Sequence, residues 1–550
     1  MNSETPEQST RYPRLMLTLT GIVTLGLLLI HWQAYYLNEQ YGLDPAIAWL
    51  LTMLFGLLGI LGWCLWAFIS AKNWRLGLLI FVVPTIFFTL YYPNLGGDVA
   101  FRGFKPRFWS DAGDYVEPAV SSAPAIDLKT TGISDFPQFM GPDRNGRIPE
   151  TNLSDDWGDP PLELWKIDVG EGWSGFAVVN GFAITQEQRG DEECVTCYDI
   201  NNGELKWINR AKRRHEDLAA MGKAGPRATP TIDQGRVYIT SGTGVLDCLN
   251  GGTGELIWSA DVPGLVGIEQ LKSKNSMGLN YTTENSRLLW GRSGSPLIVD
   301  DIVIVPAGGA DGDPESTCTL IAFDKKTGQE KWRGGNRMPS YGSPSVAVIG
   351  GKRQILFMAE DCAVGHDIQT GKELWNFQRP GNSDSDANCS QVTVVDDDRL
   401  ILSKGYSLGG ELIQIQKEGE IWVANPIHKN PRVMKTKLTN PIVHGGHVYT
   451  LSDGYLECTE IDSFERLWKQ RGRFGNGQIF LVGDKLLVHS ETGTLHLVSA
   501  TPQGYEELGT IKTIGGICWN TIALSGNLIL LRSEREAACF RLPEEPNERR

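Results

Sequence analysis

The sequence predicts an all-β fold, an eight-bladed β-propeller of four-stranded blades, preceded by three N-terminal transmembrane α-helices. Two observations carry this prediction. Three apolar runs, uncharged except for Arg75 at the edge of the third, lie within the first 92 residues, and a motif that ends in Trp recurs through residues 136–550. The 17 Trp and 63 Gly residues fit such a repeat, because each copy needs tight turns and a buried aromatic side chain.

The apolar runs occupy residues 15–37, 46–69 and 74–92. Each is long enough at helical rise to cross roughly 30 Å of hydrocarbon. A cleaved signal peptide would be a single, shorter segment, so three runs in series predict a membrane anchor over residues 1–92. Residues 93–135 contain Pro, Gly and Ser without a clear period and are predicted to form a linker.

Lys and Arg in the short loops predict the orientation of this anchor. Arg11 and Arg14 precede the first run, and Lys72 and Arg75 lie between the second and third, whereas the loop between the first and second has only acidic charges. We therefore expect a cytoplasmic N-terminus and a propeller on the extracytoplasmic, periplasmic side. Three basic residues between positions 102 and 107 oppose this assignment.

The propeller prediction rests on one recurring stretch. CYDINNGELKW (197–207) returns as CLNGGTGELIW (248–258), AFDKKTGQEKW (322–332) and GHDIQTGKELW (365–375), with weaker copies that end at residues 422, 468 and 508. Upstream of most copies, two β-branched strands flank a Gly or Asp turn. Each unit therefore predicts four short strands over roughly 40–50 residues, which is the size of a propeller blade.

Counting the copies gives eight blades, the last of which needs a strand from the beginning of the domain. Residues 521–542 supply three strands, and the chain then ends without the strand that carries the Trp. The missing strand is LELWKIDVG (162–170), with Trp165. The first propeller strand is thus predicted to complete the last blade, which removes open sheet edges.

The Trp and Gly of each copy are predicted to dock neighbouring blades. The Gly lies where the outer hairpin needs a positive φ, and the Trp buries roughly 200 Å² of ring against the next blade. Phe464 replaces the Gly of its copy and predicts a strained or altered turn. The residues assigned to docking are Trp165, Trp207, Trp258, Trp332, Trp375, Trp422, Trp468, Gly203, Gly254, Gly328 and Gly371.

Two groups of polar residues are candidates for binding. Small polar residues open the innermost strands, and they either face a ligand or water in the channel or reflect ordinary strand-start chemistry; they are Thr229, Ser295, Ser343, Asn440 and Asn520. A basic insertion at 209–227 either contacts an anion or a partner and caps the channel, or is a solvated loop. Its basic residues are Lys212, Arg213, Arg214, His215, Lys223 and Arg227.

Three further features have two readings each. Trp173 and Trp290 fall outside the docking positions and either stack on a flat ligand or pack in the core. The run GGADGDPEST (308–317), with Asp311, Asp313 and Glu315, is loosely like a Ca²⁺ loop but lacks the remaining ligands, which favours a solvated hairpin. NSDSDANCS (382–390) is interpreted in the same way.

The pair Cys194-x-x-Cys197 looks like half a zinc site or a redox dithiol. Cys197, however, occupies a position that Cys248, Ala322 and Gly365 fill in other copies, which indicates a small residue in a packed strand. Cys194 lies three strand residues earlier, so its side chain points to the opposite face. The cysteines are therefore predicted to be mostly buried free thiols, and no metal site is assigned.

These repeats resemble the pyrroloquinoline quinone (PQQ)-like β-propeller repeat, D-x-x-T-G-x-x-x-W, over about residues 136–542. This repeat occurs in bacterial quinoprotein alcohol and glucose dehydrogenases and in the outer-membrane assembly scaffold lipoprotein. The opening FPQFMGPDRNGRIPETNL (136–153) is similar to uncharacterised bacterial proteins with PQQ-like repeats. A quinoprotein site would need a Trp floor, a Glu/Asn/Asp set around Ca²⁺, an Arg or Lys on the quinone oxygens and an Asp base, and the sequence does not reveal such a set.

Two functions follow as expectations. The first is a binding or scaffold module held at the membrane, without a cofactor or catalysis, whose partner is another protein or a small ligand at the propeller channel. The alternative is a membrane-bound quinoprotein dehydrogenase that oxidises an alcohol or sugar with PQQ and Ca²⁺. A nucleic-acid partner is excluded, because the net charge is −14 and such partners require a basic face.

Overall fold

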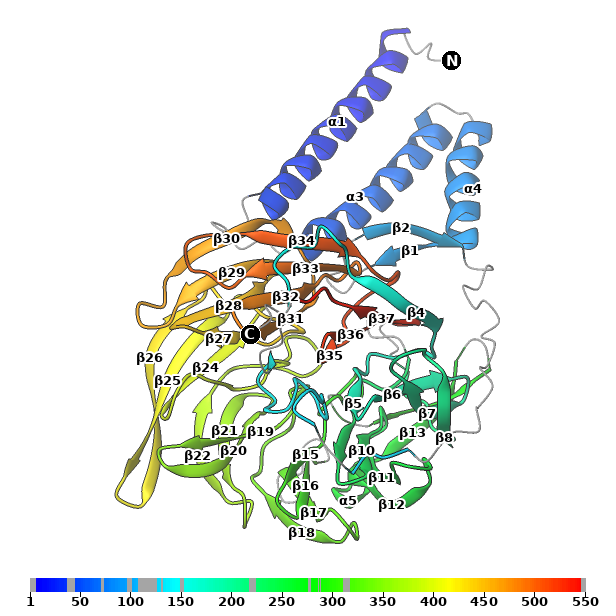
Figure 1. Cartoon of the computed structure of the whole chain (residues 1–550). Helices are drawn as coiled ribbons and strands as arrows, with labels where there is room; N and C mark the ends of the chain where they lie inside the picture. Colours follow the sequence, from blue (N-terminus) through cyan, green and yellow to red (C-terminus); the bar gives the residue numbers. More distant parts are fainter. Residues whose placement is uncertain are drawn as a thin grey trace. The chain divides into compact units, whose positions relative to one another are not determined.

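The computed structural model describes residues 6–36, 45–70, 74–95, 101–106, 126–129, 132–148, 153–216, 224–275, 278–284, 286, 288–309 and 317–545. The chain divides into two compact units, Met1–Asp114 and Tyr115–Arg550, and each is described by itself. Figure 1 shows the apolar helices of the first unit and the ring of sheets that forms the second.

The first unit contains α1 (Pro6–Tyr36), α3 (Pro45–Leu65) with a π-helical turn η1 (Trp66–Ser70), and α4 (Trp74–Leu90). Two of these helices, α1 and α3, contain 18-residue apolar windows long enough to cross a membrane. The sequence predicted three spans, but α4 has only 17 residues, about 26 Å at helical rise, which is less than the hydrocarbon core. The described helices thus give two candidate spans and one shorter apolar helix.

The predicted linker over residues 93–135 contains more structure than expected. β1 (Tyr91–Leu95) and β2 (Phe101–Pro106) form an antiparallel hairpin at its beginning. Near its end, Leu128 is buried in a core cluster of the second unit, and its carbonyl accepts a 2.9 Å hydrogen bond from Gly235. Residues 126–129 therefore pack as part of the propeller, because an apolar side chain among polar neighbours gains free energy by burial.

The second unit is the predicted eight-bladed propeller, with four antiparallel strands in each blade (Figure 1). Blades 1 to 4 are formed by β5 (Ala177–Val179), β6 (Phe182–Arg189), β7 (Glu192–Asp199) and β8 (Leu205–Ala211); β9 (Thr231–Asp233), β10 (Arg236–Thr240), β11 (Val245–Asn250) and β12 (Leu256–Asp261); β15 (Leu297–Val299), β16 (Ile302–Gly308), β17 (Cys318–Asp324) and β18 (Glu330–Gly334); and β19 (Ser345–Ile349), β20 (Lys352–Met358), β21 (Cys362–Asp367) and β22 (Glu373–Gln378).

Blades 5 to 8 continue the order. They are formed by β23 (Thr393–Val394), β24 (Arg399–Lys404), β25 (Gly409–Glu418) and β26 (Ile421–Asn430); β27 (Ile442–His444), β28 (His447–Ser452), β29 (Tyr455–Glu460) and β30 (Arg466–Arg473); β31 (Gln478–Val482), β32 (Lys485–His489), β33 (Thr494–Ser499) and β34 (Glu507–Lys512); and β35 (Ala523–Ser525), β36 (Leu528–Arg532), β37 (Glu536–Arg541) and β4 (Leu162–Asp168). In blade 8, Trp165 of β4 lies opposite Cys539 of β37. The beginning of the propeller therefore supplies the outer strand of its last blade.

The first strand of each blade lies innermost, since these strands contact one another across blade boundaries, as β35 with β5, β5 with β9 and β27 with β31 do. Three elements lie outside the blades: the two-residue β3 (Arg147–Ile148), which runs parallel to β31, and the short helix α5 (Val262–Leu265) and hairpin β13 (Gln270–Lys274) with β14 (Asn280–Glu284) between blades 2 and 3.

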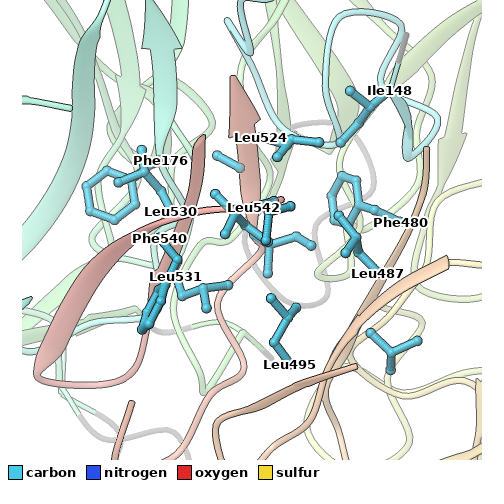
Figure 2. Close-up of a cluster of buried hydrophobic side chains, with 14 of the residues drawn as sticks. Ile148, Phe176, Phe480, Leu487, Leu495, Leu524, Leu530, Leu531, Phe540 and Leu542 are labelled. Carbon is cyan, nitrogen blue, oxygen red and sulfur yellow. The ribbon is translucent and has the colours of Figure 1, made fainter. Parts of the chain in front are cut away.

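The core is a series of apolar layers between neighbouring blades. The largest layer joins blades 6, 7 and 8 to blade 1, and Figure 2 shows Phe480, Leu487 and Leu495 of blade 7 near Leu530 and Phe540 of blade 8. Smaller clusters fill the boundaries between the other blades. This arrangement follows from the repeat, because a single blade cannot bury both faces of its sheet alone.

Four Trp residues dock on the next blade in the same way. The indole Nε1 of Trp165 donates to Ile200 O at 2.7 Å, and that of Trp207 donates to Gly251 O at 3.0 Å. Each ring covers the Gly of the facing turn so closely that a Cβ on Gly254 would lie 2.5 Å from Trp207. The pairs are Trp165 with Gly203, Trp207 with Gly254, Trp258 with Gly328, and Trp332 with Gly371, and all four glycines have positive φ.

The pattern changes at blades 4 and 5, and the expectation that Trp422 docks on the following blade is corrected. The ring of Trp375 is buried in the cluster that residues of blades 4 and 5 form, but its Nε1 donates to Gln354 of its own blade at 2.8 Å. Trp422 lies against Gly350 of blade 4, the preceding blade, because β25 and β26 are ten residues long and carry it farther out.

In blade 5, His428 takes the register position that Trp has elsewhere, opposite the bulge after Leu412. The His428 ring stacks on Phe464 with ring centroids 6.0 Å apart. Phe464 has φ +57°, which confirms the predicted strained turn at this copy. Trp468 returns to forward docking, since its Nε1 donates to Thr501 O of blade 7 at 2.9 Å.

Candidate functional site

The small polar residues that open the innermost strands form ties between blades. The backbone N of Thr229 donates to Ser295 Oγ at 2.9 Å, and the N of Ser295 donates to Ser343 Oγ at 3.0 Å. On the other side of the ring, Asn440 Oδ1 accepts from Gln391 N at 2.7 Å, and Asn520 Nδ2 donates to Ser174 O at 2.9 Å. All five of the residues singled out in the sequence are buried, and each of these bonds joins one blade to another.

Gln478 belongs to the same ring but was not recognised in the sequence. Its Nε2 donates to Leu438 O and to Trp519 O, both at 2.9 Å, and so connects blade 7 to the loops that lead into blades 6 and 8. The five residues that open the strands above are small and polar, and Gln is longer than these. The amide group nevertheless serves the same purpose, because a longer side chain can reach the carbonyls on both sides.

Residues 136–148, which we call the channel segment, contact the innermost strands of several blades. Phe136 forms a bridge with Val178 of β5, and Pro137 O accepts from Ile232 of β9 at 2.8 Å. At its other end the segment forms β3, whose Arg147 lies opposite Leu481 of β31. The segment thus lies along innermost strands of blades 1, 2 and 7, and it also reaches Pro296 of blade 3 through Arg144 and Ile442 of blade 6 at Gly146, so it lies inside the ring.

Arg144 extends from the channel segment to blade 3. Its Nη1 donates to Pro296 O at 2.9 Å and to Gln138 Oε1 at 3.1 Å, and its Nη2 donates to Ser295 O at 3.1 Å. The side chain is buried, and burial lowers the pKa of the guanidinium to about 9. The role of Arg144 is not evident from the sequence, because nothing in the local pattern shows that the segment lies in the channel.

Within the part of the chain that the structure describes, no three His, Cys, Asp or Glu side chains are placed together to hold a metal ion. The polar groups that open the innermost strands are used between blades, and the channel segment lies inside the ring. Asp311, Asp313 and Glu315, which loosely resemble a Ca²⁺ loop, lie outside the described residues.

Aromatic side chains gather where the innermost strands begin. The rings of Trp173 and Trp519 lie 4.6 Å apart, and Trp519 Nε1 donates to Glu491 Oε1 at 2.9 Å. Trp290 lies 5.1 Å from Tyr341, measured between ring centroids. Both Trp173 and Trp290 therefore pack against an aromatic partner within the protein.

The basic insertion is largely neutralised by the protein's own carboxylates. Arg213 forms an ion pair with Asp247, and the buried Arg214 binds Glu216 at 2.9 Å. Burial lowers the pKa of His215 to about 3, so this imidazole is neutral. Lys212 is exposed, whereas Lys223 lies outside the described residues.

The basic insertion and the β13–β14 hairpin pack together into one structure, which we call the insertion lobe (residues 209–216 and 262–293). Thr282 N donates to Arg214 O at 2.7 Å, and Asn275 Nδ2 donates to Glu216 Oε2 at 2.9 Å. A buried ion pair between Arg292 Nε and Glu284 Oε1, at 2.6 Å, fixes the base of the hairpin. The two insertions are therefore held together beside blades 1 to 3.

A buried charged network joins blade 8 to blade 1. Glu187 accepts from Tyr198 Oη at 2.6 Å and from Arg189 Nε at 3.0 Å, and Arg532 of blade 8 donates to Gly170 O at 3.0 Å. Burial raises the pKa of Glu187, but Arg189 and Arg532 outweigh that effect and leave the pKa below its usual value. The sequence did not reveal this network, because its members lie up to 362 positions apart.

All ten cysteines are free thiols, and nine of them are buried. Cys194 and Cys197 are buried thiols, as the sequence favoured. Burial raises the pKa of the Cys194 thiol to about 12 and raises the pKa of the Cys197 thiol even further. High pKa values make both thiols poor metal ligands and poor nucleophiles.

Comparison with known proteins identifies relatives of the propeller. A family model described as outer membrane protein assembly factor BamB matches residues 190–470 and 356–502. Among curated proteins, tetrathionate hydrolase of Acidithiobacillus ferrooxidans is 23% identical over 292 residues, which is 46% of this chain and 52% of the relative. The dehydrogenase subunit of the quinone alcohol dehydrogenase of Acetobacter aceti is 26% identical over 229 residues, 38% of this chain and 26% of the relative. The chain thus spans about half or less of these relatives.

Solved structures share the fold at low sequence identity. A europium-containing methanol dehydrogenase has a TM-score of 0.54 and 12% identity, and covers 73% of this chain and 90% of its own. A quinohemoprotein alcohol dehydrogenase from Pseudomonas putida HK5 has a TM-score of 0.52 and 14% identity, with coverage of 76% and 82%. At these identities the similarity extends to the fold alone.

Proposed function

The chain belongs to the PQQ-like β-propeller repeat family described by the BamB model, and from this premise we propose that it is a membrane-anchored, extracytoplasmic binding or scaffold module. The observation that carries the proposal is the channel segment. It lies inside the ring, where a propeller commonly binds a ligand for catalysis, and the polar groups around it tie blades together. Recognition of a large partner then takes place on the outside of the ring.

The anchor includes α1 and α3, whose apolar windows are long enough to span a membrane. The Lys and Arg residues before α1 and between α3 and α4 favour the cytoplasm for those ends. Two crossings alone would return the chain to the cytoplasm, so the proposed periplasmic propeller requires α4 to cross as a third span, which an apolar helix of 17 residues allows where the bilayer thins locally.

The partner surface is the insertion lobe. It interrupts the regular blades, and it exposes Lys212, Lys272 and Lys274 on a protein with net charge −14. Leu271, 45% exposed and next to the exposed Lys272, supplies an apolar contact. A basic surface with an apolar centre fits an acidic region of another protein.

Photo-crosslinking of the full chain in its native membrane tests this surface. A photoreactive residue replaces Leu271 in one variant and Ile421, 69% exposed at the tip of the β25–β26 hairpin, in the control. A discrete protein adduct is expected from position 271 only, and the double change Lys272→Glu and Lys274→Glu should reduce it at least tenfold. Equal adducts from both positions, or none from either, would contradict the proposed surface.

The second candidate function is a membrane-bound quinoprotein dehydrogenase acting on an alcohol or sugar. The similarity to the Acetobacter aceti dehydrogenase subunit favours it. Titration of the purified full chain with PQQ and Ca²⁺ separates the two functions. The scaffold proposal expects no saturable change in quinone absorbance and no dye-linked oxidation of alcohols or sugars, whereas saturable binding with turnover would replace it by the dehydrogenase.

A further inference from the structure

Arg144 presents a buried positive charge inside the ring of the propeller without a carboxylate to balance it. The ion pairs among the described residues do not include Arg144, and burial is the cause of its lowered pKa. The other buried arginines have carboxylates nearby: Arg379 binds Glu411 at 2.8 Å, Arg292 binds Glu284, Arg214 binds Glu216, and the charge of Glu187 acts on Arg532. Since a buried charge without a counter-charge is costly, Arg144 stands apart from these four.

The hydrogen bonds of Arg144 leave part of the guanidinium unused. An arginine has five N–H donors, and three of them bind Gln138, Pro296 and Ser295. Nε is buried and has no acceptor among the described residues, and one proton of Nη2 likewise has none. Two adjacent N–H groups of a guanidinium match the two oxygens of a carboxylate.

The backbone at Arg144 adds a second cost. Its φ is +53°, in the left-handed region that side chains with a Cβ avoid. A hydrogen bond from Arg144 N to Gly141 O, at 3.0 Å, holds this conformation. Arg144 therefore combines a strained backbone conformation with a buried charge that no carboxylate balances, and strained residues of this kind cluster at functional positions.

We propose that Arg144 is the receptor for a small carboxylate anion that binds inside the ring of the propeller, through Nε–H and Nη2–H. The carboxylate supplies the missing negative charge and accepts the two unused hydrogen bonds. Because the guanidinium is enclosed, the anion enters only when the channel segment opens locally, so binding is slow. This site goes beyond the scaffold role and does not depend on it, since the insertion lobe and its partner are separate from the channel.

The test measures the thermal unfolding midpoint of the purified full chain after prolonged incubation with acetate, with inorganic phosphate, or with chloride at equal ionic strength. Acetate should raise the midpoint in a saturable way, and the apparent affinity should fall at least tenfold in Arg144→Lys, which keeps the charge but loses the paired donors. Arg147→Met, an exposed arginine of the same segment, is the matched control and should bind as the wild type does.

Three results would overturn the proposal. The first is an acetate effect equal in Arg144→Lys and in the wild type, and the second is an effect of phosphate without one of acetate. (Methylseleno)acetate bound to the wild-type protein gives a readout that does not depend on how well a variant folds, since its selenium locates the anion by anomalous scattering in a crystal and it does not alkylate thiols. A selenium peak beside Arg144 is expected, and its absence there would be the third contrary result.

Discussion

Gly254→Ala tests whether the docking of Trp rings on glycines stabilises the ring of blades. Gly254 has φ +75°, where an alanine costs about 1–2 kcal/mol. The new Cβ would lie 2.5 Å from Trp207 Cε3, so the ring must move away. That movement weakens the 3.0 Å hydrogen bond from Trp207 to Gly251 O, worth about 1 kcal/mol, and exposes roughly 50 Å² of apolar surface, worth about 1 kcal/mol more. The expected loss in the free energy of unfolding is about 4 kcal/mol.

The matched control is Gly446→Ala. Gly446 has φ +79°, nearly the same backbone conformation, but no atom lies within 4 Å of the position of its Cβ. It should therefore lose only the backbone part, about 1–2 kcal/mol. Urea unfolding of both full-length variants, followed by far-UV circular dichroism, gives the two losses. If the variants lose equal stability, the Trp–Gly contact does not contribute and the reasoning about docking is wrong.

Three further predictions concern other parts of the propeller. Phe464→Gly restores the residue that most copies have, yet it should destabilise the protein by about 2 kcal/mol. Loss of the buried ring costs about 3–5 kcal/mol, which exceeds the relief of backbone strain at φ +57°. A rise in the urea midpoint would contradict this. Burial raises the pKa of Glu193 to about 7. The stability that this carboxyl group contributes to the folded state, about 3 kcal/mol, is therefore fully present below pH 4.5 and is lost by pH 8, when the group is ionised. Glu193→Gln should therefore flatten the fall in stability between pH 5 and pH 8, and an unchanged fall would refute the assignment. The ten thiols should resist a thiol-specific disulfide reagent at neutral pH and all react in guanidinium chloride, whereas rapid reaction of Cys194 in the native protein would disprove its burial.

Much of the architecture was accessible from the sequence, because every blade repeats the same physical solution. The copies with both Gly and Trp predicted their turns and their contacts, as at Trp207 and Gly254. Blade 5 was misread because periodicity alone cannot show that a hairpin has lengthened, so Trp422 was assigned the position that His428 occupies. Repeats predict where a side chain lies only as long as the strand lengths are constant.

The candidate site was less accessible for a different reason. The residues that open the innermost strands were found, but whether they face a ligand or a neighbouring blade depends on distances between blades, which no local pattern contains. Arg144 and Arg532 were missed because each makes the contacts that join it to another blade with residues more than 140 positions away in the chain. Contacts of that kind arise from the closure of the whole ring and not from any one copy.

The pairing of β4 with β37 also sets the order of events during synthesis. Trp165 lies opposite Cys539, 374 positions later in the chain. At typical elongation rates of about 5–20 residues per second, the strand Leu162–Asp168 waits roughly 20–75 s for its partner. During that interval its exposed apolar side chains and unpaired backbone N–H and C=O groups can pair with other chains and cause aggregation. A protein built in this way therefore depends on protection of its first strand until translation reaches the last blade.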